Sequence, residues 1–240
     1  MKPLGIIVNP KANRGGAAVI GEQVFEAFAK AGIAVINLSA GTALEAKKKA
    51  EELIRSQEIS ALVAVGGDGT TQLCAGIAIP NQIPLGIIPA GSGNDQAREL
   101  KIDLTNIPAA VKNILDSLES PKRVDAMKVS VSGKEIWSMG SISGGFDALC
   151  ATRANSLRWP KGPNSYIAAL LLELPSFNAI EYHLDVDGEK RVIEAMLCGV
   201  ANVKNFGGGM MISPNSDITD GELEVFILHK VSRARLLRIF

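Results

Sequence analysis

Apolar and polar residues alternate in two different patterns along the chain, and the pattern changes near its middle. In the first half, short apolar runs alternate with stretches of helical periodicity. This pattern predicts strands near Leu4, Ile33, Ala61 and Leu85, and helices near Ala17, Ala43, Gln72, Ala97 and Ile107. Because regular alternation of strands and helices is typical of a parallel sheet covered on both faces, we expect a doubly wound α/β domain over residues 1–120.

In the second half, strand patterns follow one another with few helical stretches between them. The alternation of apolar residues predicts strands over residues 123–131, 136–142, 180–186, 191–200 and 223–228. Short turns that contain Gly133 and Gly188 join two pairs of these strands, which favours antiparallel hairpins. We therefore expect a mostly antiparallel, sandwich-like β domain over residues 121–240.

The loop after the third predicted strand carries the clearest candidate chemistry. An apolar run, Ala61–Val65, leads into Gly66-Gly67-Asp68-Gly69-Thr70. Since glycines lack a Cβ atom, they let backbone N–H groups approach phosphate oxygens, and Asp68 can hold a magnesium ion or a water molecule beside them. The motif favours a nucleotide triphosphate site, with a plain strand-to-helix turn capped by Asp68 as the alternative.

Two further polar loops follow predicted strands of the same sheet. One contains Gly91-Ser92-Gly93-Asn94-Asp95, and the other begins with Asn9-Pro10 and carries two cations, Lys11 and Arg14. Loops at the carboxyl ends of neighbouring parallel strands share one edge of the sheet, so we expect all three to line one site. None has the spacing of a Walker A loop or of the dinucleotide-binding glycine motif, so the phosphates must be held in another way.

These motifs, in this order and at about this spacing, resemble the diacylglycerol kinase catalytic-domain family, which includes bacterial lipid kinases and sphingosine kinases. Later blocks of the chain are similar to the family as well: Val124-Asp125, Gly144 to Ala148, Ala201-Asn202, Gly207 to Pro214 and Asp217 to Gly221. The resemblance covers essentially the whole chain. It implies transfer of the γ-phosphoryl group of ATP to the hydroxyl group of diacylglycerol or a related lipid alcohol, with ATP and Mg2+ as cofactors.

The resemblance also implies roles for particular residues. It places the nucleotide among Asn9, Pro10, Lys11, Ala12, Asn13, Ser39, Gly66, Gly67, Asp68, Gly69, Thr70 and Ser92. It implies a structural Mg2+ at Asp220, to which Asp217 and Glu222 contribute largely through backbone oxygens. The second domain would then bind the lipid acceptor.

Two features depart from the family pattern. Gln72 and Leu73 stand where relatives commonly have an Asn-Glu pair, and the sequence ends at Phe240, within a helix expected over Val231–Phe240. Relatives continue with further strands, one of which carries an Asp-Gly-Glu whose acid is assigned to catalysis. We therefore expect the second domain to be incomplete at its C-terminal end, and Asp68 is the catalytic candidate that the sequence does contain.

Two alternative functions stay open. An NAD kinase-like enzyme shares the Gly-Gly-Asp-Gly loop and a following β domain, but lacks the Asn-Pro opening and the Gly-Ser-Gly-Asn-Asp loop. A non-catalytic nucleotide- or lipid-binding module is suggested by Leu73 and by the absent catalytic segment.

Charge and cysteine content limit the partners and the location. Lysine plus arginine equal aspartate plus glutamate at 25 each, so no overall field attracts nucleic acid, and contact with a membrane surface would be local and transient. Cys74, Cys150 and Cys198 stand singly in apolar surroundings, which predicts buried, reduced thiols and a cytoplasmic protein. A lipid substrate would place that protein peripherally at the inner membrane face.

Two further expectations concern apolar surface. The richest apolar segment, residues 166–175, is too short to span a bilayer, and we expect a packed helix there or the border of an acyl-chain cleft. An incomplete β domain would leave strand edges and apolar surface open, which predicts a homo-oligomer.

Overall fold

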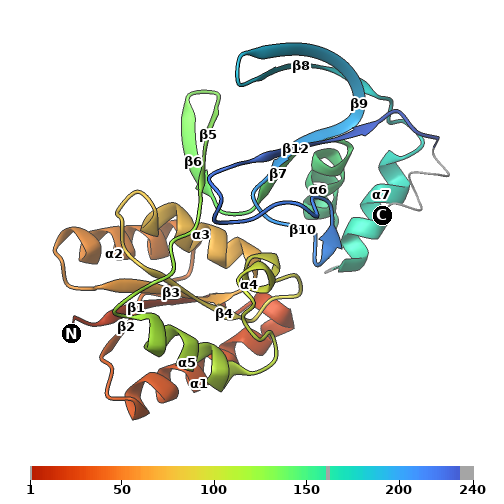
Figure 1. The fold of residues 1–240 in the computed structure, drawn as a ribbon. Helices are drawn as coiled ribbons and strands as arrows, with labels where there is room; N and C mark the ends of the chain where they lie inside the picture. Colours follow the sequence, from red (N-terminus) through yellow and green to blue (C-terminus); the bar gives the residue numbers. More distant parts are fainter. Residues whose placement is uncertain (1, 161–162, 233–240) are drawn as a thin grey trace. The chain divides into compact units, whose positions relative to one another are not determined.

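The chain forms two compact units, which are described separately (Figure 1). The computed structural model describes residues 2–160 and 163–232, so the helix expected over Val231–Phe240 lies almost wholly outside the described residues. The first unit comprises the chain up to Gly140 together with Asn202–Glu222, and the second comprises Ser141–Ala201 and the chain from Leu223 onward. The division into domains over residues 1–120 and 121–240 stays a prediction.

A four-stranded parallel sheet lies at the centre of the first unit. Its strands, in the order β2-β1-β3-β4, are β1 (Leu4–Val8), β2 (Val35–Asn37), β3 (Ala61–Gly66) and β4 (Leu85–Pro89). Leu4 lies beside both Val35 and Ala61, and Leu62 lies beside Leu85. The parallel sheet of the expected α/β fold is confirmed.

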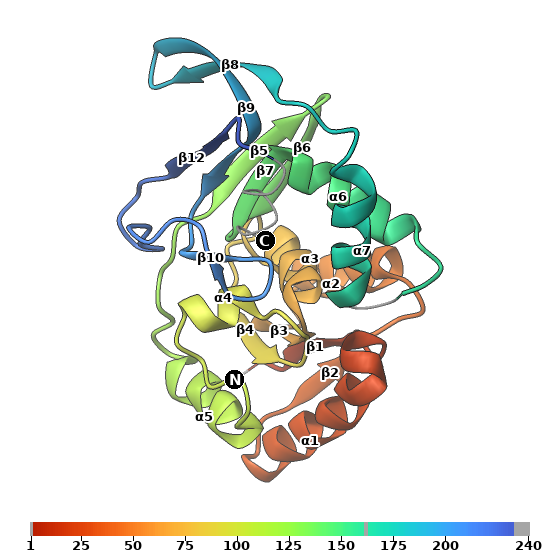
Figure 2. The ribbon, with the colours of Figure 1, turned by 90° about the vertical axis from the view of Figure 1, so that its right-hand side faces the viewer.

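Helices cover both faces of this sheet (Figure 1, Figure 2). The helices α1 (Gly16–Lys30) and α5 (Ile107–Ser117) pack on one face, and α2 (Ala43–Arg55) and α3 (Asp68–Ala78) pack on the other. Successive strand side chains alternate between the two layers: Ile6 lies in the core with α1 and α5, whereas Ile7 lies in the core with α2 and α3. Burial on both faces explains why these strands are continuous apolar runs, and it confirms the doubly wound arrangement.

Capping residues set the helix boundaries in this unit. Thr42 and Glu45 form a capping box at the start of α2, in which each side chain accepts the backbone N–H of the other at 3.2–3.3 Å. The side chain of Asn106 caps α5. The short helix α4 (Asp95–Glu99) begins directly from the glycine loop after β4, with Asn94 as its left-handed N-cap.

Two antiparallel hairpins complete the first unit. They are β5 (Met127–Val131) with β6 (Lys134–Ser138), and β10 (Asn205–Phe206) with β11 (Met210–Met211). The hairpin turn expected at Gly133 is confirmed. The second of these hairpins belongs to the segment that returns to the unit after a long excursion of the chain.

The single strand expected over residues 136–142 is wrong. The strand β6 ends at Ser138, and β7 begins at Ser141 as part of the second unit. Between them, the carbonyl oxygen of Met139 accepts a hydrogen bond from the side-chain amide of Asn202 at 3.0 Å, and the same amide group donates to the carbonyl of Asp125. A side chain from a distant segment therefore takes the place of a ladder partner at this point.

The second unit is an antiparallel sheet with two helices. Its strands are β7 (Ser141–Gly145), β8 (Ile180–Val186), β9 (Glu189–Ala201) and β12 (Glu224–His229), and its helices are α6 (Phe146–Ser156) and α7 (Pro163–Glu173). The long strand β9 pairs with β8 along its first part, with β7 along its second part, and with β12. Phe146, Cys150, Leu170 and Met196 form its core. The antiparallel β part of the expected fold is thus also confirmed.

The cysteines and the apolar helix behave as the sequence predicts. Cys74, Cys150 and Cys198 are buried and form no disulfide within the described chain, and burial raises the pKa of Cys74 to about 12. The expected packed helix is α7, of which Ala169 and Leu170 lie in the core of the second unit, together with Leu174 directly after the helix. Across the residues that the structure describes, no helix is long and apolar enough to cross a membrane.

Candidate active site

Three loops meet at the carboxyl ends of β1, β3 and β4, as expected for neighbouring parallel strands. Backbone hydrogen bonds tie them together: the N–H of Asn9 donates to the carbonyl of Val65 at 3.0 Å, and the N–H of Ala90 donates to the carbonyl of Gly66 at 2.8 Å. In the loop after β1, the side-chain oxygen of Asn9 accepts a hydrogen bond from the backbone N–H of Lys11 at 3.2 Å, which stabilises the turn. One edge of the sheet therefore carries all three polar loops.

The glycines of two of these loops are required by direct backbone packing. A Cβ atom on Gly91 would lie 2.3 Å from the Cα of Gly67, and a Cβ on Gly93 would lie 2.5 Å from a carboxylate oxygen of Asp68. Both distances are far below van der Waals contact, and the first neighbour is backbone that cannot rotate away. The loops after β3 and β4 are therefore packed tightly against each other. These glycines are needed for that contact, whether or not they also approach a phosphate group.

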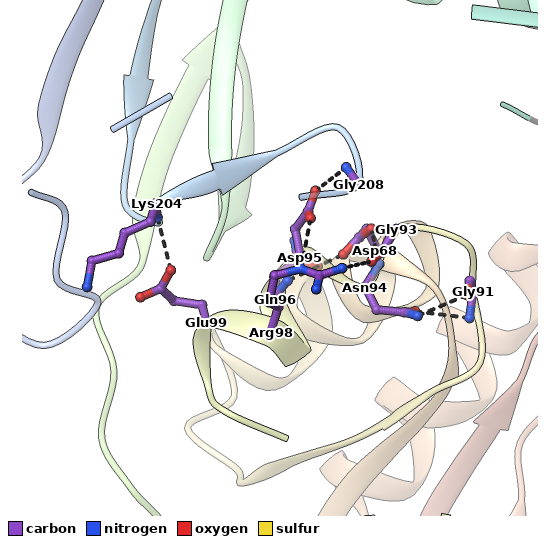
Figure 3. A network of polar contacts seen from close by, with 10 residues as sticks. All are labelled: Asp68, Gly91, Gly93, Asn94, Asp95, Gln96, Arg98, Glu99, Lys204 and Gly208. Atoms are coloured by element: carbon purple, nitrogen blue, oxygen red, sulfur yellow. Dashed lines mark hydrogen bonds and ion pairs between the residues drawn. The ribbon is translucent and has the colours of Figure 1, made fainter. Parts of the chain in front are cut away.

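The carboxylate of Asp68 lies at the centre of this packing (Figure 3). It accepts hydrogen bonds from the backbone N–H of Asn94 at 2.8 Å and of Gln96 at 3.4 Å. Burial raises the pKa of Asp68, and the charge of Asp95 raises it further, while the backbone hydrogen bonds partly oppose both effects. Asp68 is thus a fixed, half-buried carboxylate with a second acid beside it.

Asp95 is a site residue that the sequence analysis did not single out. One of its carboxylate oxygens accepts the backbone N–H of Gly208 at 2.8 Å. The other oxygen is buried without a hydrogen-bond partner among the described residues, and lies 3.9 Å from the Arg98 guanidinium. Carboxylate oxygens are donors that Mg2+ prefers, so Asp68 and Asp95 are the residues of this site that could hold a divalent cation, although the described residues contain no group of three or more such side chains placed around one. The signal in the sequence was the second aspartate-bearing glycine loop.

The hairpin β10–β11 is the fourth segment of the site. Its tip, Gly207-Gly208-Gly209, has positive φ at all three positions, where other residues would be strained. Besides the bond from Gly208 to Asp95, the N–H of Lys204 donates to the Glu99 carboxylate at 3.0 Å (Figure 3). Two carboxylates of α4 therefore hold this distant hairpin beside the loop after β4.

Comparison with known proteins agrees with this arrangement. Residues 3–129 match the family model described as diacylglycerol kinase catalytic domain, and residues 140–240 match the model described as YegS C-terminal NAD kinase beta sandwich-like domain. A diacylglycerol kinase of Mycobacterium tuberculosis (strain H37Rv) is 31% identical over 236 residues, which cover 98% of this chain and 75% of that relative. The chain belongs to the diacylglycerol kinase family.

Further relatives extend the likeness over the same range. A diacylglycerol kinase of Bacillus subtilis (strain 168) is 28% identical over 241 residues, covering 100% of this chain and 78% of that protein. The crystal structure of a diacylglycerol kinase from Bacillus anthracis (strain Sterne) superimposes with a TM-score of 0.71 at 24% identity, covering 99% of this chain and 77% of that one. At this identity, the structural match supports the fold alone.

Other residues that the family resemblance assigned to the nucleotide lie around the same edge of the sheet. The Ser39 hydroxyl accepts the backbone N–H of Val8 at 2.9 Å, which places it at the end of β1. Lys11 and Asn13 are exposed in the loop after β1, and Ser92 is exposed in the loop after β4. Their contacts with a nucleotide stay a prediction.

The departure from the kinase family pattern at residues 72 and 73 has a structural explanation. Gln72 donates a hydrogen bond from its side-chain amide to the carbonyl of Trp137 in β6. Leu73 packs at the edge of the apolar core between the sheet and the helices α2 and α3. Both side chains therefore stabilise the first unit.

The predicted structural metal site is an exposed turn. Asp217 accepts hydrogen bonds from the N–H and hydroxyl of Thr219, and Asp220 accepts the N–H of Glu222 at 2.9 Å. The hydroxyl and N–H of Thr219 lower the pKa of Asp217, with Lys204 and Lys122 contributing. The described residues contain no group of three or more His, Cys, Asp or Glu side chains placed to hold a metal, so Mg2+ at this turn would depend on backbone oxygens and stays a prediction.

Proposed function

We propose that this chain transfers the γ-phosphoryl group of ATP to the hydroxyl group of diacylglycerol or of a related lipid alcohol. The observation that carries the proposal is the convergence of four loops around two adjacent acids, Asp68 and Asp95, at one edge of the sheet. Family membership supplies the reaction class, since the relatives are lipid kinases by name.

The nucleotide lies, in this proposal, against the loops that follow β1, β3 and β4. The backbone N–H groups and the exposed Lys11 interact with phosphate oxygens, and Ser39 and Ser92 border the site. When Mg2+ is bound beside Asp68 and Asp95, it neutralises charge on the phosphate oxygens. Phosphoryl transfer depends mainly on positioning and on charge neutralisation, and the locked loops provide a fixed frame for both.

Asp68 is our candidate for accepting the proton of the acceptor hydroxyl. Burial and the charge of Asp95 raise its pKa, and a carboxylate with a raised pKa is a better base than an ordinary aspartate. The hydrogen bonds from Asn94 and Gln96 fix the carboxylate, so its direction does not depend on a bound nucleotide. Asp95, whose second oxygen lacks a hydrogen-bond partner among the described residues, would then face the metal, because a cation on the Asp68 carboxylate itself would lower its pKa.

The test is a transfer assay with radiolabelled ATP and Mg2+ against diacylglycerol, long-chain alcohols and NAD. We expect label in the lipid fraction, and we expect Asp68→Asn to abolish it. Asp116→Asn is the matched control, because Asp116 is an exposed acid near the end of α5. Label in NAD alone would favour the NAD kinase-like alternative, and nucleotide binding without any transfer would favour the non-catalytic module.

A further inference from the structure

The guanidinium group of Arg98 is held in a fixed place within the candidate active site (Figure 3). One of its terminal nitrogens donates to the carbonyl oxygen of Gly93 at 3.3 Å, and its Nε lies 3.9 Å from the carboxylate of Asp95. A Cβ atom on Gly209 would lie 3.6 Å from each of Nε, Cζ and Nη2 of Arg98, and a point equally far from these three atoms lies above the plane of the group. The tip of the hairpin β10–β11 therefore covers one face of this cation.

Most of the hydrogen-bonding capacity of Arg98 is unused. A guanidinium group carries five N–H donors in a planar fork. Within the described part of the chain, its hydrogen bond to Gly93 has no counterpart at its other N–H groups, and the 3.9 Å separation from Asp95 is an ion pair without a hydrogen bond. The Arg98 side chain is 40% exposed. Its remaining donors are thus available to a ligand that offers several acceptor oxygens.

The acids beside Arg98 make a cation necessary if a phosphate group is to bind there. Asp68 and Asp95 lie close enough that the charge of Asp95 helps to raise the pKa of Asp68. A phosphate group would add negative charge to the same place. Lys204, the other cation drawn in Figure 3, points away from these two acids, and its charge acts on Asp217. Among the residues drawn in that view, Arg98 is the cation that lies beside the acids.

We propose that Arg98 binds the γ-phosphate of ATP and neutralises charge on the group that is transferred. This inference rests on the proposed function, because it names a further substrate-binding residue of the same site. A planar guanidinium group can bind two oxygens of one phosphate at once, and it stays charged at every working pH. The contacts with Gly93 and Gly209 fix its direction before a nucleotide arrives, so little reorganisation is needed as charge develops during transfer.

The first test compares ATP with ADP, by titration calorimetry in the presence of Mg2+ and without a lipid acceptor. We expect the wild-type chain to bind ATP more tightly than ADP, because ADP lacks the γ-phosphate. Arg98→Gln should weaken ATP binding about tenfold or more, which is the worth of one charge-assisted contact, and should leave ADP binding within about twofold. Arg98→Lys keeps the charge without the planar fork, so its ATP affinity should lie between the two.

Arg55→Gln is the matched control for these measurements. Arg55 is an exposed arginine at the end of α2, from which the chain returns to the start of β3, so it lies at the opposite edge of the same sheet. Its replacement removes the same charge from the first unit, and we expect the affinities for both nucleotides to stay at their wild-type values.

The second test measures transfer with the same variants and radiolabelled ATP. An arginine that stabilises the charge of a transferring phosphoryl group is worth about 1,000-fold or more in rate, and we expect Arg98→Gln to lower kcat by about that factor. Arg55→Gln should keep the wild-type kcat.

A purely structural role for Arg98 predicts a different pattern, because its guanidinium group also touches the hairpin β10–β11. Glu99→Ala removes the carboxylate that accepts the N–H of Lys204, so it loosens this hairpin and leaves the guanidinium group in place. We expect Glu99→Ala to lower the melting temperature and to keep the preference for ATP over ADP. The proposal is overturned if Glu99→Ala loses that preference as Arg98→Gln does, or if Arg98→Gln weakens the binding of both nucleotides equally. Unchanged ATP binding in Arg98→Gln overturns it as well.

The two tests together separate this inference from the proposed function. If ATP binding depends on Arg98 but no lipid is labelled, the proposed function fails and Arg98 remains a ligand of the γ-phosphate. If lipid is labelled and Arg98→Gln works at the wild-type rate, the proposed function stands and the role of Arg98 is wrong. A chain that binds neither nucleotide contradicts both.

Discussion

Two acidic turns in the first unit contain the same kinds of residue and differ in almost every physical property. Asp68 and Asp95 are held within packed loops, and burial raises the pKa of Asp68. Asp217 and Asp220 lie in an exposed turn, where hydrogen bonds from Thr219 lower the pKa of Asp217. In the sequence, both are short acidic motifs next to glycines.

The difference lies in how far away the hydrogen-bond donors are along the chain. The amides that bind the Asp68 carboxylate come from Asn94 and Gln96, and the amide that binds Asp95 comes from Gly208. Asp217 is bound by Thr219, two residues away. A carboxylate fixed by distant segments is desolvated and preorganised by the fold, whereas a carboxylate in a local turn is not. Proximity to glycine in sequence does not distinguish the two cases.

The largest expected effect of this difference is on catalysis at Asp68. Asp68→Asn removes the charge that faces the reacting phosphate, and we expect the transfer rate to fall about 100-fold or more. The melting temperature should change little, because the loss of one acceptor for the N–H of Asn94 or Gln96 is offset by removal of the cost of a partly buried charge. Asp217→Asn, which changes the exposed turn in the same way, should keep transfer near the wild-type rate. A mutant at position 68 with normal turnover contradicts the assignment.

The packing of the two buried loops gives the next largest effect. Gly91→Ala forces a Cβ atom against the backbone of Gly67, and we expect a loss of stability of about 1–3 kcal/mol, measured by urea unfolding. Gly76→Ala is the matched control, because a Cβ there meets nothing within 4 Å in α3 and should be neutral or stabilising. Equal unfolding midpoints for the two variants would show that the loops can separate at little cost.

The exposed turn is tested by metal removal. If Mg2+ is bound at Asp217–Glu222 in the native state, a chelator should lower the stability of the wild-type chain by about 1–3 kcal/mol, through the loss of a ligand that binds only the folded protein. Asp220→Ala should melt lower and no longer respond to the chelator. If wild type and variant melt alike with and without chelator, hydrogen bonds account for the turn without a metal, including the one that the N–H of Gly221 donates to Asp125.

The same distinction explains what the sequence predicts well. The strands of the parallel sheet and the loops that follow them depend on local apolar runs and on strand order, so the edge carrying Asn9, Asp68 and Asn94 is predictable. The return of the hairpin β10–β11 to this edge depends on contacts of Asp95 and Glu99 with residues more than one hundred positions later. No local pattern contains that information.

The break between β6 and β7 has the same origin. The apolar alternation continues through residues 136–142, but the side chain of Asn202 takes the carbonyl of Met139, and the chain passes into another unit. From the sequence, these glycines are expected to let backbone N–H groups approach phosphate. The structure shows that Gly67 and Gly91 are also needed for contact with each other. Long-range packing therefore explains each feature that local reasoning missed.

The smallest and most specific expected effect concerns the coupling of the two buried acids. Asp95→Asn removes the second cause of the raised pKa of Asp68 and leaves desolvation, while an Asn oxygen can still accept the N–H of Gly208. The pKa of Asp68 should fall toward its ordinary value, so Asp68 stays ionised to lower pH. The acid limb of the normalised kcat/KM profile should then move to lower pH, because activity requires the ionised carboxylate.

NMR titration of the Asp68 carboxyl carbon measures the same shift without an activity assay. Asp116→Asn should leave both curves in place. If the Asp68 titration is the same in Asp95→Asn and wild type, the two acids are electrostatically independent, and burial alone sets the pKa of Asp68.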